Sequence, residues 1–542
     1  MTSAWCGTLV DRGMEMRLVL HIGEGADGLL EGTLDNLDLG RMGMAVDGIT
    51  LDQGALRFSV DDIGARFEGR MSRDGRKARG DWRMDDDAAL PLELHRVTPS
   101  ALEGIWAGTL SFQSMRLRLE FYLAGGRDGV IGAMKSIDQN GAMVPLSWTR
   151  LAGSAVLLEA RGINACFTGT IDADGSEIAG TWTQNQVEIP LSLQRTAVQE
   201  EPPARPQEPE PPFPYREEEV RYRNHRANCE LAATLTIPEG GGPFPAVLLI
   251  SGSGEHDRDG SMAGHRPFLV LADFLTRRGV AVLRSDDRGV GESGGEFHQS
   301  TTSDFATDAE AAVDFLRGRT GIDARRIGLI GHSEGALIAA MVAARDQGIA
   351  FIIMLAGPGL PGWVLAGQQA RRQAELSGSN AQEAGRLNED LVAILRSETD
   401  LPKLRRKLDQ RLAHLPESQR APVVDYCCHP WQRHFVTLTP ADFLRRVTCP
   451  VLALTGEKDV LVEPKSNLAA IREAVEAGGN RNFEVAEMAG LNHLFQTCDT
   501  GSATEYGQIE ETLSPVLLDK VAQWIAARGR YAPGEFFNAQ AE

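Results

Sequence analysis

Residues 325–345 read RRIGLIGHSEGALIAAMVAAR, and this stretch decides the fold. Its first residues, RRIGLI, have the apolar character of a short buried strand, and the alanine-rich run after Gly335 is a strong helix former. Between them, GHSEG (331–335) fits the pattern G-x-S-x-G, which places a serine on a sharp strand-to-helix turn. Gly331 and Gly335 allow the close approach of strand and helix that such a turn requires. The stretch therefore predicts an α/β architecture with Ser333 as a nucleophile.

A second stretch, GESGG at 291–295, fits the same pattern. A strand lies some residues upstream of it, but no helical pattern follows. Four glycines fall within the seven residues 289–295, which is typical of a loop. We therefore predict that Ser293 is a turn residue and that Ser333 is the reactive serine.

The chain around these two motifs alternates short apolar strands with helical patterns. Such alternation predicts a mostly parallel, doubly wound sheet with helices on both faces. The expected strands are AVLLIS (246–251), VAVLRSD (280–286), RIGLIG (326–331), FIIMLAG (351–357), PVLALTG (450–456) and NFEVAEM (482–488).

A nucleophilic serine needs a histidine as base and a carboxylate that orients the histidine. In this arrangement the chain order is serine, acid, histidine. Asp459 follows the strand CPVLALTG on the loop GEKD, and His493 follows in GLNH. The predicted triad is therefore Ser333, Asp459 and His493. Glu457 and Glu463 remain alternatives for the acid.

The loop SGSG (251–254) follows the first strand of this half, where backbone N–H groups of an oxyanion hole are expected. We predict that the N–H groups of Ser253 and Glu334 bind the oxyanion. The Glu334 side chain is expected to be exposed in the first helical turn, where negative charge suits the helix dipole.

About ninety residues, 360–448, separate two of the expected strands and are rich in helix formers. An insertion at this place predicts a helical cap that excludes water and shapes the substrate pocket. Cys427, Cys428, His429 and His434 lie within it, but they form no C-x-x-C pair and there is no second cluster. No metal and no other cofactor is therefore expected.

The first 197 residues contain an internal repeat with an offset of 99 to 101 residues. Alternating apolar residues and Asp-Gly turns within each copy predict two antiparallel β units, each a small barrel or sandwich. The expected domains are β units at 1–98 and 99–197, a Pro- and Glu-rich linker at 198–214, and a catalytic domain at 215–530. The landmarks that recur are Trp5 and Trp106, Phe67 and Phe167, Trp82 and Trp182, and Pro91 and Pro190.

Composition narrows the classes of protein that this chain can belong to. The formal net charge of -20 opposes binding to a phosphate backbone, so no nucleic-acid partner is expected. No apolar run approaches the length of a membrane span. Seven scattered cysteines and the lack of a signal peptide predict a cytoplasmic protein, or an exported one if a signal was removed.

Several of these segments together resemble bacterial α/β-hydrolases of the carboxylesterase EstD type, related to the serine aminopeptidase S33-like hydrolases. The resemblance spans roughly residues 218–530. It implies a carboxylesterase without a cofactor, with Ser333, Asp459 and His493 as nucleophile, acid and base and a small ester as substrate. The segments that carry it are GSGEHDRDG, SDDRGVGESGG, TTSDFATDAEAAVDFL, IGLIGHSEGALIA, CPVLALTGEKD and GLNHLFQ.

Other functions fit the same residues. A Ser-His-Asp triad also serves hydrolysis of small peptides, aminoacyl amides or acyl thioesters. A function of another class is ligand binding by the two β units, with the hydrolase as an accessory. The expected activity is the hydrolysis of small or short-acyl carboxylic esters through an acyl-enzyme.

Overall fold

The computed structural model divides the chain into two units, residues 1–202 and 203–542. The structure describes the following residues: 3–11, 14–24, 29–52, 54–84, 89–98, 100–112, 115–127, 129–138, 142–184, 187–196, 203–376, 379–503 and 505–528.

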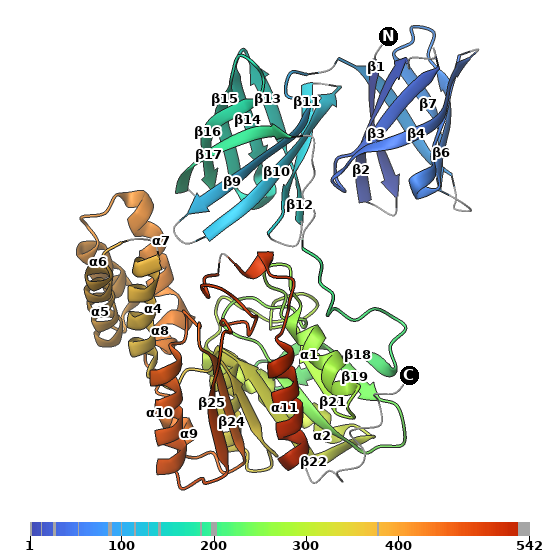
Figure 1. Cartoon of the computed structure of the whole chain (residues 1–542). Helices are drawn as coiled ribbons and strands as arrows, with labels where there is room; N and C mark the ends of the chain where they lie inside the picture. The colour runs from blue at the N-terminus through green and yellow to red at the C-terminus, as the bar shows by residue number, and fades with distance from the viewer. Residues whose placement is uncertain are drawn as a thin grey trace. The chain divides into compact units, whose positions relative to one another are not determined.

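The first β repeat is a closed barrel of eight antiparallel strands (Figure 1). Consecutive strands pair, and β1 also pairs with β8, which closes the ladder. Alternate residues point inward, so Trp5, Phe67 and Trp82 are each at most 2% exposed in a shared core. The strands are β1 (Ser3–Asp11), β2 (Met14–Glu24), β3 (Leu30–Asn36), β4 (Arg41–Asp52), β5 (Ala55–Val60), β6 (Ala65–Met71), β7 (Lys77–Met84) and β8 (Leu90–Val97).

The strands of the second β repeat follow one another along the chain much as in the first, but they form an open sheet of nine strands. Where the first copy has the single strand β4, the second has β12 and β13, which pair with different neighbours and end the sheet on its two sides. Pro145 ends β12, and the chain then crosses from β11 to β14: the Leu146 N–H donates to the Gly132 carbonyl at 3.0 Å and the Ser147 N–H to the Glu159 carbonyl at 2.7 Å. The strands are β9 (Gly104–Phe112), β10 (Met115–Gly126), β11 (Gly129–Ser136), β12 (Ala142–Pro145), β13 (Trp148–Ala152), β14 (Ala155–Ala160), β15 (Ala165–Ile171), β16 (Glu177–Gln184) and β17 (Val187–Thr196).

The second unit contains a sheet of eight strands in the order β18-β19-β21-β20-β22-β23-β24-β25. Its last six strands are parallel, and the edge pair β18 and β19 is antiparallel. The predicted fold class is confirmed, whereas this edge pair was not among the expected strands. The strands are β18 (Tyr215–Asn224), β19 (Cys229–Pro238), β20 (Phe244–Ile250), β21 (Ala281–Ser285), β22 (Ile322–His332), β23 (Ile352–Leu355), β24 (Val451–Gly456) and β25 (Phe483–Met488).

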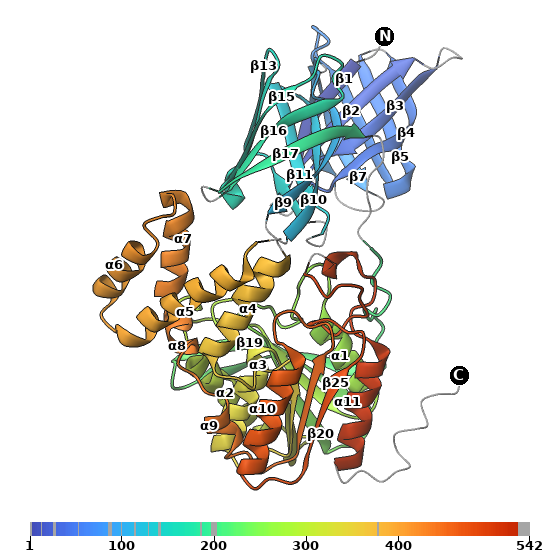
Figure 2. The same ribbon diagram turned by 60° about the vertical axis from the view of Figure 1, so that its left-hand side comes forward.

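Helices cover both faces of this sheet (Figures 1 and 2). Residues on one side of the strands share a core with α2 (Thr302–Gly318), α3 (Glu334–Arg345), α9 (Ala441–Leu444) and α10 (Pro464–Ala477). Residues on the other side pack against α1 (Pro267–Thr276) and α11 (Pro515–Arg528). Burial of both faces explains why the central strands are continuously apolar.

In the described part of the chain six helices lie between β23 and β24, within the insertion expected to form the cap; the last of them is α9, named above. The middle helices have their own small core, which includes Leu391, Leu404, Leu408 and Val424. This core makes the insertion a separate layer rather than an extension of the sheet. The other helices are α4 (Gly362–Leu376), α5 (Ala381–Ser397), α6 (Leu401–Arg411), α7 (Glu417–Cys428) and α8 (Pro430–Phe435).

Part of the segment expected to be a linker is bound to the second unit. Arg205 donates hydrogen bonds to the carbonyl oxygens of Gly507 and Ile509, both at 2.8 Å. Gln207 donates to the Leu513 carbonyl at 2.7 Å. The remaining expected linker residues, 198–202, lie outside the described residues. Among the described helices, none is long and apolar enough to cross a membrane.

Candidate active site

Ser333 stands between the end of β22 at His332 and the start of α3 at Glu334. Its backbone has φ 55° and ψ -119°, a conformation that residues with a Cβ rarely adopt. Both glycines of the motif are required because neither position has room for a Cβ atom. A Cβ on Gly331 would lie 2.0 Å from the Gly335 carbonyl oxygen, and one on Gly335 would lie 2.2 Å from the Ile250 carbonyl oxygen. The G-x-S-x-G spacing is thus the only way to bring strand, turn and helix this close.

The structure brings Asp459 and His493 together. The Asp459 Oδ2 atom lies 2.7 Å from His493 Nδ1, and both side chains are almost fully buried. The other carboxylate oxygen accepts hydrogen bonds from the N–H groups of Leu461 and Val462, each at 2.8 Å. Three contacts therefore hold the carboxylate, and the contact with Nδ1 leaves Nε2 as the free nitrogen of the imidazole.

The alternative acids contact other groups. Glu457 accepts a hydrogen bond from the Gly490 N–H at 2.8 Å. Glu463 caps α10 by accepting from the N–H groups of Lys465 and Ser466. These contacts favour Asp459 over both glutamates as the partner of His493.

His332 is a further residue of the site that the sequence did not single out. Its Nε2 atom lies 2.9 Å from the His493 carbonyl oxygen, and the two rings are 4.8 Å apart. Burial lowers the pKa of His332 to about 3, so its ring is neutral and donates one hydrogen bond. This hydrogen bond from His332 holds the backbone of His493 in place. Its position inside the motif was the only sequence signal for this role.

The loop after β20 lies against the nucleophile. A Cβ on Gly252 would be 3.2 Å from the Ser333 Cβ, which shows how closely the loop backbone passes. Asp287 anchors this loop at two points, because it accepts hydrogen bonds from Ser251 Oγ at 2.6 Å and from the His256 N–H at 3.0 Å. Burial raises the pKa of Asp287 to about 7.

Glu334 corrects one expectation. Its side chain is 3% exposed rather than on the surface of the first helical turn. It accepts hydrogen bonds from Ser253 Oγ at 2.8 Å and from Trp431 Nε1 at 2.7 Å. Burial raises the pKa of this carboxyl group. Contacts with two segments far away in the sequence, and not the helix dipole, decide where the side chain lies.

Two small cavities adjoin the loop at Ser251 and Gly252. One, of about 50 Å³, has mixed walls, in which Asp287 and Asp308 lie among apolar side chains. The other, of about 40 Å³, is mostly apolar. Its apolar walls come from Met262, Phe268, Leu271, Leu355, Leu494, Phe495 and Leu513.

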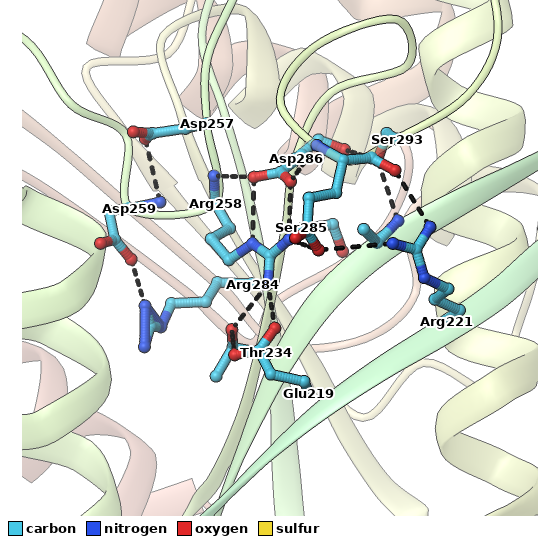
Figure 3. Close-up of polar contacts among 12 residues, drawn as sticks. Glu219, Arg221, Thr234, Asp257, Arg258, Asp259, Arg284, Ser285, Asp286 and Ser293 are labelled. Carbon is cyan, nitrogen blue, oxygen red and sulfur yellow. Dashed lines mark hydrogen bonds and ion pairs between the residues drawn. The ribbon is translucent and has the colours of Figure 1, made fainter. Parts of the chain in front are cut away.

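Ser293 lies in a different environment, shown with its surroundings in Figure 3. Its hydroxyl donates to the Asp286 carbonyl and accepts from the Ala232 N–H, both at 2.9 Å. Asp286 in turn binds Arg258 through both carboxylate oxygens, at 3.0 and 2.7 Å (Figure 3). This loop is therefore held by a buried polar network, and the Ser293 hydroxyl is fully used within it.

The cysteines and histidines of the insertion do not gather. Cys427 and Cys428 are buried at the end of α7, and His434 contacts Ser303 Oγ through Nε2 at 3.1 Å. In the described part of the chain, no group of three or more potential metal ligands is present.

Comparisons with known proteins concern this second unit. Residues 243–497 match the family described as serine aminopeptidase, S33. Esterase EstD of Thermotoga maritima is 26% identical over 299 residues, which cover 54% of this chain and 65% of EstD. An uncharacterised 31.7 kDa protein from the traX-finO intergenic region of Escherichia coli is 25% identical over 277 residues, 49% of this chain and 91% of that protein. The Pyrococcus furiosus esterase Pf2001 has a TM-score of 0.38 and 17% identity, covering 58% of this chain and 90% of that chain.

The alignment with EstD spans just under two thirds of that esterase. The family match and the EstD alignment confirm the resemblance predicted from the sequence. The second unit is therefore similar to α/β hydrolases of the EstD kind.

Proposed function

We propose that this α/β hydrolase is a serine carboxylesterase that cleaves small or short-acyl esters through an acyl-enzyme on Ser333. The observation that carries the proposal is the 2.7 Å contact between Asp459 and His493, with a serine on a strained turn at the end of β22, which is separated from β24 by one strand. A buried Asp-His pair and a serine held at φ 55° are parts of the machinery of nucleophilic acyl transfer.

In this mechanism His493 Nε2 takes the Ser333 hydroxyl proton while Oγ attacks the ester carbonyl carbon. Asp459 holds the Nδ1 proton and stabilises the imidazolium that forms. The N–H groups of Ser253 and Glu334 donate to the tetrahedral oxyanion. His493 then gives the proton to the departing alcohol, and water cleaves the acyl-enzyme by the same steps in reverse.

The apolar cavity beside Gly252 supports the preference for a short acyl group. Its volume is about 40 Å³, and leucine, phenylalanine and methionine side chains form its walls. One water-sized site needs about 10–15 Å³, so the cavity has room for roughly three such sites. An acyl chain of two to four carbons matches that space.

A substrate panel tests the proposal. Purified full-length protein is assayed with p-nitrophenyl esters of graded acyl length, an aminoacyl anilide and an acyl thioester. The expected result is a maximum of kcat/KM at the short esters. A higher kcat/KM on the anilide would identify an aminopeptidase, and a higher value on the thioester would identify a thioesterase. Mass spectrometry after treatment with a fluorophosphonate should find the label on Ser333, and a label elsewhere would refute the nucleophile assignment.

A further inference from the structure

The side chain of Glu334 connects two parts of the protein that the catalytic cycle uses differently. Oε2 accepts from Ser253 on the loop proposed to bind the oxyanion, and Oε1 accepts from Trp431 on α8 of the inserted helices. One carboxylate thus receives a hydrogen bond from each side. It is also the residue directly after the proposed nucleophile.

The surroundings of this carboxylate make such a placement costly. Glu334 is 3% exposed, and no lysine or arginine pairs with it in the described part of the chain. A buried carboxylate held only by neutral donors lowers the stability of a fold unless its hydrogen bonds are complete. Here both oxygens have donors, so the two contacts with Ser253 and Trp431 depend on one another.

The loop from Ser251 to His256 has two kinds of anchor. Asp287 holds the two ends of the loop by accepting hydrogen bonds from Ser251 Oγ and from the His256 N–H. Like the loop itself, Asp287 lies outside the inserted helices. Glu334 holds its middle through the Ser253 hydroxyl, beside a contact of His256 Nε2 with the Ser253 carbonyl at 3.2 Å, and only the Glu334 anchor also reaches the inserted helices. The alignment of the Ser253 N–H is therefore sensitive to whether Trp431 is in place.

We propose that the Glu334 carboxylate is a positioning group that couples the seating of α8 to the geometry of the oxyanion hole. The inference rests on the proposed function. When Trp431 donates to Oε1, Oε2 stays aligned with Ser253, and the Ser253 N–H points at the developing oxyanion. When α8 moves away, the carboxylate loses one donor, and it is then free to turn and carry the Ser253 side chain with it. The hydrolase is then least active when its substrate pocket is open to water.

A double-mutant cycle in the full-length chain tests this coupling. Ser253→Ala removes the loop donor, and we expect kcat on a short p-nitrophenyl ester to fall about tenfold with KM changed less than about twofold. Trp431→Phe keeps the ring stacked on Phe435 but removes the N–H donor, and we expect kcat to fall about fivefold. In the Ser253→Ala background, Trp431→Phe should lower kcat by less than about twofold, because the contact it acts through is already gone.

Ser251→Ala supplies the matched control cycle. Ser251 lies on the same loop but bonds Asp287 instead of Glu334. In that background Trp431→Phe should still lower kcat about fivefold, since the Glu334 bridge is intact. Ser303→Ala removes a different contact with α8, the one with His434, and should leave kcat unchanged. Thermal unfolding of each variant checks that the fold is kept.

The outcomes separate the coupling from the proposed function. Multiplicative losses in Ser253→Ala with Trp431→Phe would overturn the coupling, as would a wild-type kcat in either single variant. Fluorophosphonate labelling of the unmodified protein gives the independent readout. Label on Ser333 without coupling would refute only the role of Glu334, whereas no label on Ser333 would refute the proposed function itself.

Discussion

The loops GESGG and GHSEG have the same pattern but use the serine in opposite ways. In the first, the Ser293 hydroxyl donates one hydrogen bond and accepts another from buried backbone groups. In the second, Ser333 has φ 55°, and its hydroxyl has no hydrogen-bond partner among the described residues. A serine with a saturated hydroxyl stabilises a loop, and one held in strain with a free hydroxyl is available for attack. The pattern alone does not separate them, but the secondary structure on either side does.

The largest expected effect is on catalysis by Ser333. Ser333→Ala should lower kcat/KM by at least about 10⁴-fold, because the nucleophile is removed. The free energy of unfolding of Ser333→Ala, measured with urea, should equal or exceed that of the unmodified protein. Ser293→Ala is the paired variant and should keep kcat/KM within a small factor. If the two variants lost activity equally, the distinction between the loops would be wrong.

Asp459→Asn should have the next largest effect. The amide cannot hold the same His493 tautomer, and a loss of about 10³- to 10⁴-fold in kcat is expected. Steady-state kinetics measures it, with Glu457→Gln as the control, since Glu457 bonds only the Gly490 N–H. A nearly normal rate for Asp459→Asn, or a large loss for Glu457→Gln, would reassign the acid.

Ser293→Ala should affect stability instead of chemistry. It leaves the buried Ala232 N–H and the Asp286 carbonyl without their shared partner. We expect the free energy of unfolding to fall by about 3 kcal/mol, measured by urea denaturation of the second unit's transition. An unchanged midpoint would mean that water replaces the hydroxyl in this loop.

The smallest expected effect is a pH dependence of the free energy of unfolding. It comes from His332 of GHSEG, and GESGG contains no histidine. His332 is neutral in the folded state because its pKa is lowered to about 3, whereas in the unfolded chain it binds a proton below about 6.5. Acidification therefore favours the unfolded chain, and the stability lost between pH 6.5 and 5 is about 2 kcal/mol for this group. The unfolding free energy of His332→Gln should depend less on pH by that amount. Equal pH dependence in both proteins would show that His332 is charged in the fold.

Much of the second unit could be predicted because its local signals agree. The strand before Ser333 and the helix after it are visible in the sequence, and the order of Asp459 and His493 follows from the arrangement of the loops. The edge strand β18 was missed, since the charged residues of YREEEVRYRN give no buried strand signal, and β19 was missed although its residues are mostly buried. Edge strands with one solvated face carry such residues regularly.

The side chains of Glu334 and His332 show why other parts could not be predicted. Propensity places a glutamate in the first helical turn but does not say whether a distant segment will cover it. Its burial depends on Trp431, which lies 97 positions away in the sequence. His332 likewise acquires its role only from the His493 carbonyl above it. Both are consequences of tertiary contacts between segments with no local relation.

The two β repeats differ in how their ladders can open. In the first copy β4 pairs with both neighbours, so no strand can leave the barrel without breaking hydrogen bonds on two sides. In the second copy β12 and β13 each have one neighbour. Fraying can begin at either of these ends and proceed one strand at a time. The division of one strand into two edge strands thus separates a repeat that opens only as a cooperative block from a repeat that can unzip.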